Sequence, residues 1–307
     1  MEAITFTPLY MQRIWGGHQL ETFYGRSLPD AASPFGEAWE IVDREDEQSV
    51  VDAGKFSGRS LHQLWTNHRS EIFGTGLPDS ERFPLLIKIL DSADDLSIQV
   101  HPPAQIAATL GGEPKTEMWF IADTKPGAKL YVGLKQGATR HSFEQAITEG
   151  TVADQVHVIT PEAGESIFIE SGRLHAIGAG FLIHEIQQNS DTTYRVFDWN
   201  RIDSAGKPRE LHVKESLACI DFTDFAPEMD TPSGDTLATC PYFKTTRHTL
   251  APGETISTAT NDRFSLLTIV SGKLEGGHGA GRTLLLPVGC TPLKAVEDTT
   301  VLRITIP

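Results

Sequence analysis

Cysteine is scarce in this chain of 307 residues. The three copies, Cys219, Cys240 and Cys290, stand far apart, and none forms a CxxC pair. A disulfide framework or a thiolate zinc site is therefore not expected, because both need paired or clustered cysteines.

The sequence also lacks the segments that direct a protein into or across a membrane. Its start, MEAITFTPLYMQRIWGG, has no basic region followed by an apolar one, so we expect no signal peptide. No apolar run approaches the ~20 residues of a membrane-spanning helix. Together with the scattered cysteines, these absences predict a reduced, soluble, cytoplasmic protein.

Positive charge is in short supply, since 26 Lys and Arg stand against 41 Asp and Glu and give a formal net charge of -15. Such a field repels nucleic acids and anionic lipid surfaces, so neither is expected as a partner. No obligate protein partner is evident either. A small anionic substrate would need a local cluster of Lys and Arg. The chain also has no glycine-rich phosphate loop and no alternation of strands with helices.

What the sequence does have is a series of short strand-like runs bounded by Gly, Pro or Asp, as in β-sandwiches and barrels. The runs predict strands over residues 37–43, 84–91, 95–101, 117–123, 129–134, 165–171, 180–188 and 193–199. Helical patterns are local and predict short helices over residues 60–73, 103–110, 141–150 and 208–220. The sequence thus indicates a mostly β fold with a few short helices.

A change of composition near residue 222 divides the chain. Residues 223–307 are rich in Thr, Gly and Pro and hold few chemically reactive side chains. We therefore predict a larger domain over residues 1–222, which carries the chemistry, and a smaller β domain over residues 223–307.

The predicted strand DLSIQVH carries polar side chains on one of its faces. Residues two apart in a strand share a face, so Ser97, Gln99 and His101 project to the same side. Pro102 holds His101 in an extended conformation at the end of the strand. A histidine at a strand end is by itself more typical of a surface or packed residue, so a functional role needs support from elsewhere in the chain.

Two further segments contribute residues of a matching chemical kind. KTEMWF places Glu117 at the start of a strand, and SGRLHAIGAG places His175 after a tight glycine turn. Two histidines, a glutamate and a neutral oxygen donor such as Gln99 suit a divalent cation like zinc. Spacing does not show that residues 101, 117 and 175 meet, so separate structural roles stay equally open at this point.

The order of these segments resembles that of the type I mannose-6-phosphate isomerases. The resemblance rests on PLLIKILDSADDLSIQVHP, EPKTEMWF, SGRLHAIGAG and EIQQNSDTTYRVFDWNR, and it extends over residues 9–220. The IWGG and GEAWEIVD segments are similar to the compact bacterial branch of that family. The resemblance implies a double cupin (β-jelly-roll) architecture, one zinc ion per chain, and interconversion of mannose 6-phosphate and fructose 6-phosphate.

Transferred motif by motif, the resemblance also implies roles for individual residues. The implied metal ligands are Gln99, His101, Glu117 and His175, with water as the alternative to Gln99 in the compact branch. The implied catalytic residues are Arg195 and Lys115, and the implied substrate-binding residues are Lys88, Ser97 and Arg201. Lys88 interrupts an apolar strand, where a charge is costly unless it is paired or functional, and we expect it to bind the phosphate; a salt bridge to an acid or a charge that reaches solvent is the alternative. Arg201 is a second candidate for the phosphate, with a surface position equally open.

The sequence departs from the longer members of the family in two places. Only 57 residues (118–174) separate Glu117 from His175, so the helical domain that longer members carry there must be absent or reduced to the predicted helix over 141–150. Pro114 stands where longer members have a histidine, which puts in doubt any acid–base role at that position.

The implied reaction moves a proton between C2 and C1 of the sugar through a cis-enediol. It needs a base and a group that stabilises the enediolate charge, for which zinc and Arg195 are the candidates. The base stays open among Glu185, a metal-bound hydroxide and Lys115 with a depressed pKa. Two other functions are also kept: a metal-dependent cupin oxygenase, which the phosphate-binding cations disfavour, and a non-catalytic sugar-phosphate-binding cupin.

Overall fold

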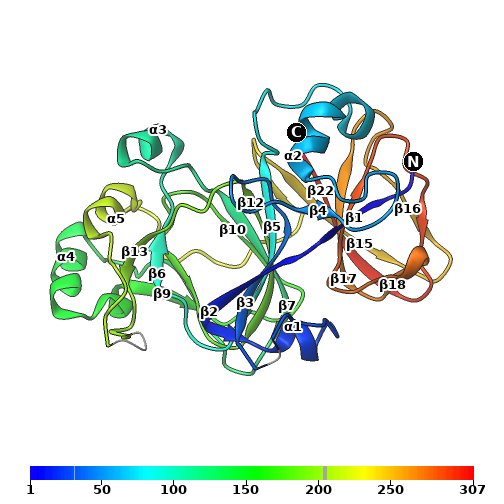
Figure 1. The fold of residues 1–307 in the computed structure, drawn as a ribbon. Coiled ribbons are helices and arrows are strands. Elements are labelled where there is room, and N and C mark those ends of the chain that lie inside the picture. Colours follow the sequence, from blue (N-terminus) through cyan, green and yellow to red (C-terminus); the bar gives the residue numbers. More distant parts are fainter. Residues whose placement is uncertain (31, 203–205) are drawn as a thin grey trace.

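The structure is a computed structural model that describes residues 1–30, 32–202 and 206–307. Figure 1 shows two groups of strands side by side, which we call the first lobe (mostly blue to green) and the second lobe (mostly orange and red), with both termini in the second. Antiparallel sheets make up most of both lobes. The predicted mostly β fold of double cupin type, with a few short helices, is confirmed.

The first lobe contains a six-stranded and a five-stranded sheet. The six-stranded sheet has the order β10-β7-β12-β5-β2-β3, with β2 (Leu9–Gly17), β3 (Phe35–Ile41), β5 (Leu85–Ser92), β7 (Glu117–Thr124), β10 (Ser166–Ile169) and β12 (Phe181–Gln188). The five-stranded sheet has the order β13-β6-β11-β8-β9, with β6 (Ile98–Val100), β8 (Leu130–Leu134), β9 (Val156–Ile159), β11 (His175–Ile177) and β13 (Tyr194–Phe197). Leu90 and Trp119 of one sheet and Val132 of the other belong to one core cluster, so the two sheets face each other.

The second lobe is organised by a seven-stranded sheet in the order β14-β15-β22-β17-β20-β1-β4. Its strands are β1 (Ile4–Thr7), β4 (Val50–Val51), β14 (Thr236–Thr239), β15 (Lys244–Leu250), β17 (Ser265–Ser271), β20 (Thr283–Leu286) and β22 (Thr299–Thr305). Two short ribbons accompany it: β16 (Thr255–Ile256) with β21 (Leu293–Lys294), and β18 (Lys273–Leu274) with β19 (His278–Gly279). The sheet of the C-terminal part thus takes two strands, β1 and β4, from the first 51 residues.

The helices are short, and the α-helices are α1 (Gln19–Thr22), α2 (Leu61–Asn67), α3 (Ala104–Ala107), α4 (Arg140–Glu149) and α5 (Val213–Cys219). Single turns of other types cover Arg69–Phe73 (π) and Ala108–Leu110, Val152–Gln155 and Glu275–Gly277 (3₁₀). Each predicted helix and strand overlaps an observed one, although the helix predicted over 208–220 begins only at Val213. No helix of the described residues is long and apolar enough to cross a membrane.

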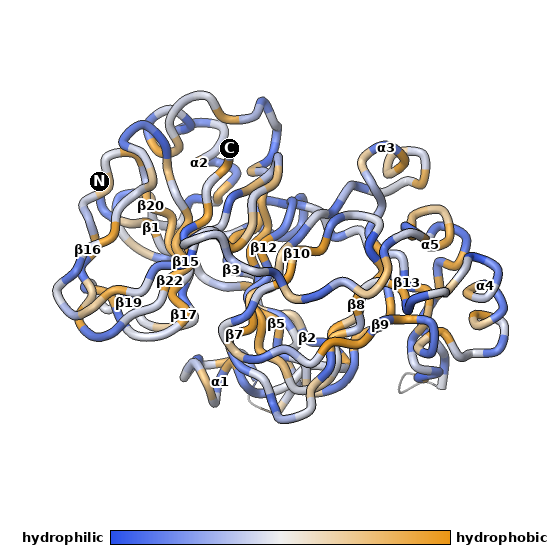
Figure 2. Tube along the Cα trace, turned by 180° about the vertical axis from the view of Figure 1, so that it is seen from behind, coloured by the Kyte–Doolittle hydropathy of each residue, from blue (hydrophilic) through white to orange (hydrophobic). Residues whose placement is uncertain are grey.

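An aromatic cluster joins the two lobes. Trp65 and Phe73 lie beside Phe83 and Phe264, with ring centroids 5.3 Å apart for Trp65 and Phe83 and 5.1 Å apart for Phe73 and Phe264. All four are at most 3% exposed and share a core cluster with residues of both lobes. Figure 2 shows apolar residues along inner strands such as β5, β7 and β17. This packing fixes the strands that carry the site described next.

Candidate active site

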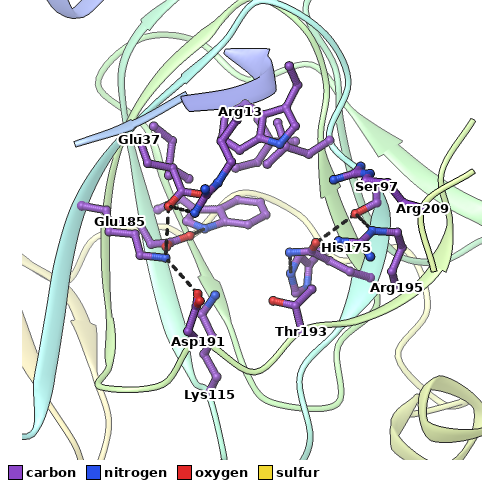
Figure 3. A pocket seen from close by; sticks show the side chains of 17 residues that line it. Arg13, Glu37, Ser97, Lys115, His175, Glu185, Asp191, Thr193, Arg195 and Arg209 are labelled. Atoms are coloured by element: carbon purple, nitrogen blue, oxygen red, sulfur yellow. Dashed lines mark hydrogen bonds and ion pairs between the residues drawn. The ribbon is translucent and has the colours of Figure 1, made fainter. Parts of the chain in front are cut away.

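A pocket of about 410 Å³ lies between the two sheets of the first lobe (Figure 3). The strands contribute the lining residues Arg13, Trp15, Glu37, Lys88, Leu90, Gln99, Trp119, His175, Ile177, Glu185 and Arg195. The loops contribute Leu96, Ser97, Lys115, Asp191, Thr193 and Arg209. Most of the residues predicted from the motifs therefore meet in one cavity, although they come from positions far apart in the sequence.

His101, Glu117 and His175 form a compact cluster at this pocket, which His175 lines. Their nitrogen and oxygen ligand atoms all lie within 4.8 Å of one another. Nε2 of His101 is 3.5 Å from Oε2 of Glu117, and Nε2 of His175 is 3.7 Å from Oε1. Each residue is 1% exposed, and neither His101 Nε2 nor Glu117 Oε1 has a hydrogen-bond partner. Buried, unpartnered nitrogen and oxygen atoms that face one another fit a divalent cation.

Main-chain carbonyls orient both imidazoles. Nδ1 of His101 is 2.9 Å from the carbonyl oxygen of Thr192, and Nδ1 of His175 is 2.9 Å from that of Arg173. A carbonyl can only accept, so Nδ1 carries the proton and Nε2 presents its lone pair to the cluster. Burial, followed by the charge of Lys115, lowers the pKa of His101, and burial, followed by the proximity of His101, lowers that of His175 to about 3. Both rings are therefore neutral at pH 7, the form that binds metal.

Gln99 lies next to this cluster because β6 pairs with β11, which sets Gln99 opposite His175. Its Nε2 is 3.4 Å from His175 Nε2, and its Oε1 accepts a hydrogen bond of 3.2 Å from Ser97 Oγ. A half-turn of the amide group would exchange the two atoms and bring the oxygen to the cluster. Gln99 is thus within reach of a cation, and water remains the alternative ligand.

Lys115 is a buried cation beside the same carboxylate, with Nζ 3.2 Å from Oε2 of Glu117. Burial alone would lower the pKa of Lys115, but the negative charges of Glu117, Glu185 and Asp191 outweigh it and raise the pKa. The depressed pKa that a base role for Lys115 requires is therefore not found. Lys115 enters the site as an ammonium ion.

Lys88 is surrounded by the carboxylates of Glu37, Glu185 and Asp191, which lie on one side of the pocket in Figure 3. Its Nζ lies 3.6 Å from Glu185, 3.8 Å from Glu37 and 3.9 Å from Asp191. The ring of Trp39 lies against the same ammonium group, with Nζ 4.9 Å from its centroid. Three carboxylates already surround this one cation and would repel a further anion, so these surroundings do not suit the phosphate contact predicted for Lys88.

Two of these carboxyl groups have pKa values that are displaced in opposite directions. Burial, and next the negative charge of Glu117, raise the pKa of Glu185. Burial also acts to raise the pKa of Glu37, but the charges of Lys88 and Arg13 outweigh it and lower that pKa to about 2. Glu37 is consequently a fixed anion, whereas Glu185 is closer to exchanging a proton near neutral pH. Pairs of acids displaced in this way are typical of proton-transfer sites.

Arginine dominates the opposite side of the pocket. Arg195 donates from Nε to Ser97 Oγ over 3.2 Å and from Nη1 to the carbonyl of Glu210 over 2.9 Å. Arg209 lies beside it in Figure 3, near Ser97 and away from the carboxylates around Lys88. Burial, followed by the charge of Arg209, lowers the pKa of Arg195. The pocket therefore has an acidic side and a basic side, with His175 between them.

Arg201 does not belong to the lining of the pocket in which it was predicted to bind the substrate. Its guanidinium instead lies 2.6 Å from the carboxylate of Asp198 and 3.3 Å from that of Asp94. The prediction assumed that the chain stays extended after residue 197. Trp199 and Asn200 both have φ of 55°, in the left-handed region, so the alternation of faces ends before Arg201.

Several pocket residues had no place in the prediction, namely Arg13, Glu37, Trp119, Asp191 and Arg209. Glu37 carried a usable signal, because GEAWEIVD places an acid on the same strand face as a tryptophan. Trp119 donates from Nε1 to Glu185 over 3.0 Å, which the sequence alone does not indicate. Arg209 lies in the segment predicted as a helix over 208–220 but precedes the observed helix, which begins at Val213, so the predicted pattern does not lead to its place in the pocket.

Comparisons with known proteins agree with this geometry. The family model "Phosphomannose isomerase type I, catalytic domain" matches residues 4–117. Mannose-6-phosphate isomerase ManA of Bacillus subtilis is 34% identical over 310 residues, which cover 95% of each chain. Mannose-6-phosphate isomerase of Streptococcus mutans is 39% identical over 216 residues, 68% of this chain and 66% of that one. The crystal structure of mannose 6-phosphate isomerase from Bacillus subtilis superposes with a TM-score of 0.87 at 30% identity, over the full length of both chains.

Proposed function

This chain belongs to the type I phosphomannose isomerases and is an aldose–ketose isomerase of mannose 6-phosphate and fructose 6-phosphate, and from this premise we propose that its chemistry depends on one zinc ion held by His101, Glu117 and His175. The observation that carries the proposal is the set of buried ligand atoms within 4.8 Å of one another. Gln99 or a water molecule would complete the set. When bound, zinc supplies a Lewis acid that stabilises negative charge on the sugar oxygens.

We assign the transfer of the proton between C2 and C1 to Glu185. It is buried, lines the pocket, and is held by a hydrogen bond from Trp119, so its carboxylate has a fixed direction. Its raised pKa makes it a better base near neutral pH than an ordinary, strongly acidic carboxylate. Metal-bound hydroxide remains the competing candidate for this role, and Lys115 drops out of it.

The cations of the pocket would then stabilise the enediolate and orient the substrate. Lys115 and Arg195 are fixed positive charges that can stabilise the enediolate without reorganising. Lys88, held by Glu37, Glu185 and Asp191, would orient hydroxyl groups of the sugar through its ammonium protons. Ser97, which bonds to Arg195, stays a proposed substrate-binding residue.

Neither runner-up function gains from a specific observation. Two histidines and one glutamate would also serve an oxygenase that uses non-haem iron, but such an enzyme has no need for the basic side of the pocket. A purely binding protein has no need for a buried carboxyl group with a raised pKa. We further propose that the enzyme works in the cytoplasm, where its free Cys219, Cys240 and Cys290 stay reduced.

A single assay tests the proposal. Purified protein is stripped with a chelator, reloaded with zinc, and followed for conversion of mannose 6-phosphate to fructose 6-phosphate. We expect activity to disappear on stripping and to return with zinc. Full activity in the stripped protein, verified to be metal-free by elemental analysis, would rule out the metal role. Absence of turnover in the zinc-loaded protein would rule out the isomerase reaction itself.

A further inference from the structure

The basic side of the pocket contains two guanidinium groups that differ in how they are held. Arg195 comes from strand β13, whereas Arg209 comes from the loop that follows it and reaches the same end of the cavity (Figure 3). The contacts of Arg195 within the described residues are with Ser97 Oγ and a carbonyl, and no described carboxylate pairs with it. This end of the pocket therefore carries more positive charge than its own side chains neutralise.

A buried carboxylate fixes the direction of Arg209. Asp198 is 5% exposed and accepts from Arg209 through both of its oxygens, from Nε over 2.7 Å and from Nη2 as well. Arg201 binds the same carboxylate from Nη2 over 2.6 Å. A carboxylate held by two guanidinium groups cannot rotate freely, so Arg209 enters the pocket on a rigid support.

The acidic side and the basic side of the pocket differ in net charge, so they suit different parts of a substrate. Lys88 lies within 4 Å of three carboxylates, whereas on the basic side Arg209 shares the carboxylate of Asp198 with Arg201, and no described carboxylate pairs with Arg195. A phosphate monoester carries close to two negative charges at pH 7 and is matched by planar, forked donors such as guanidinium groups. The basic side is where such a dianion would be stabilised most.

We propose that Arg209, together with Arg195 and Ser97, binds the phosphate group of the substrate, and that Asp198 and Arg201 are positioning residues that hold Arg209 in place. This inference rests on the proposed function and makes it more specific. It moves the phosphate from Lys88 to the basic side of the pocket, and it makes Arg209 rather than Arg201 the direct ligand. It also gives Arg201 an indirect role through Asp198.

The test uses the zinc-loaded full-length enzyme and two readouts, the KM for mannose 6-phosphate and inhibition by inorganic phosphate. In Arg209→Gln we expect both the KM and the phosphate inhibition constant to rise about 10- to 100-fold, with kcat changed much less, because a hydrogen-bonded charge pair is lost in the ground state as well as in the transition state. Arg209→Lys, which keeps the charge but loses the fork, should fall in between. Arg282→Gln, which removes an arginine paired with Asp52 in the second lobe, is the matched control.

The positioning role is tested separately with Asp198→Asn and Arg201→Gln. If both act through Arg209, each raises the KM and the phosphate inhibition constant by a smaller factor than Arg209→Gln, and neither adds to the effect of Arg209→Gln in the double variant. A loss of stability without a change in KM would show that they are structural only. Unchanged secondary structure by circular dichroism accompanies each measurement.

The outcomes separate this inference from the function on which it rests. An active Arg209→Gln enzyme with an unaltered KM and unaltered phosphate inhibition would overturn the inference and leave the isomerase intact. If instead Lys88→Ala weakens phosphate inhibition more than Arg209→Gln does, the phosphate belongs on the acidic side and the inference is also wrong. Should the wild type show no turnover, the proposed function fails, and calorimetric titration with inorganic phosphate still decides whether Arg209 binds the anion.

Discussion

The interiors of the two lobes differ in kind, although both are built from antiparallel sheets. Among the described residues, the charged or histidine side chains that are buried are Glu37, Glu40, Asp43, Lys88, Asp91, His101, Lys115, Glu117, His175, His184, Glu185 and Asp198. The polar side chains buried in the part after residue 222 are all hydroxyl groups: Thr245, Thr258, Ser265, Thr268, Thr283 and Thr299. Leu267, Leu284 and Val301 fill a core cluster there instead. The β framework does not make a site by itself; the side chains that its strands turn inward do.

This contrast indicates that the two lobes contribute differently to stability and to chemistry. Burial of charged groups opposes folding unless partners compensate it, and an incompletely paired site such as the one around His101 and Glu117 lowers stability. Burial of apolar side chains is the main force that favours folding. We therefore expect the second lobe, with the aromatic cluster of Trp65, Phe73, Phe83 and Phe264, to stabilise a first lobe whose interior is shaped for chemistry. Four predictions follow this contrast from the largest effect to the smallest.

Replacing a buried metal ligand of the first lobe by an apolar side chain, of the kind that fills the second lobe, should abolish catalysis. In His101→Leu we expect zinc to be lost and isomerase activity to fall by on the order of 10³-fold or more, because a Lewis acid contributes several kcal/mol. The metal-free variant should differ little in stability from metal-free wild type, since the gain from replacing an unpartnered buried nitrogen is opposed by the loss of the hydrogen bond from Nδ1 to the Thr192 carbonyl. Zinc content, activity and thermal unfolding are measured together. A fully active variant that retains zinc would contradict the ligand assignment.

Removal of one proton-transfer group should lower kcat without emptying the metal site. In Glu185→Gln we expect kcat to fall about 10²- to 10⁴-fold, the usual contribution of a positioned base, with zinc still bound. Glu297→Gln, at an exposed position of the second lobe, is the control and should behave as wild type. Retention of most of the kcat in Glu185→Gln would favour metal-bound hydroxide as the base.

A cavity in the second lobe should lower stability and leave catalysis unchanged. Leu284 is fully buried in the apolar cluster of that lobe, so we expect Leu284→Ala to lower the free energy of unfolding by about 2–5 kcal/mol. The kcat and KM of the folded enzyme should not change, because the residue lies outside the pocket lining. Urea unfolding and steady-state kinetics at low temperature measure the two effects. A specific loss of kcat would show that the lobes do not divide stability from chemistry.

Low pH should destabilise the first lobe, because the buried histidines lie there. His184 is fully buried with Tyr24 Oη 2.7 Å from its Nε2, and burial lowers its pKa from 6.5 to about 3. Between these values the unfolded chain binds a proton that the folded chain does not, so stability falls as the pH falls, by up to about 1.4 kcal/mol per pH unit for this group. Urea unfolding from pH 7 to pH 4 should show a shallower decline in His184→Gln, and no such change in His141→Gln, an exposed position. Equal slopes in wild type and His184→Gln would exclude His184 as a source of acid sensitivity.

Sequence and structure agree best where a residue's role depends on a strand and its neighbours in a motif. Ser97, Gln99 and His101 were predicted to share a face; Ser97 and Gln99 line the pocket, and His101 belongs to the ligand cluster beside it. Arg201 was misplaced because the left-handed turn at Trp199 and Asn200 is not visible in composition or periodicity.

Roles that depend on partners from distant segments were beyond prediction for a different reason. The raised pKa of Lys115 and the enclosure of Lys88 by three carboxylates result from side chains up to about 100 residues away in the sequence. Arg209 is placed by Asp198 across the same turn. Spacing predicts which residues share a strand face. Which charged side chains lie next to one another depends on how the two sheets pack, and spacing does not predict that.

The pairing of β1 with β20 has a consequence for how the protein is made. Ile4 is paired with Leu285, so β1 and one of its two neighbours in the sheet lie very far apart in the sequence. β1 can pair with β4 on one edge, but its other edge stays open until residues 283–286 are present, and the second lobe cannot be completed from residues 223–307 alone. Contacts of such long sequence separation slow folding, and an exposed strand edge invites association with other chains. We therefore expect the complete chain to fold late and the isolated C-terminal segment to aggregate, which makes the N-terminal strand a necessary part of any expressed fragment.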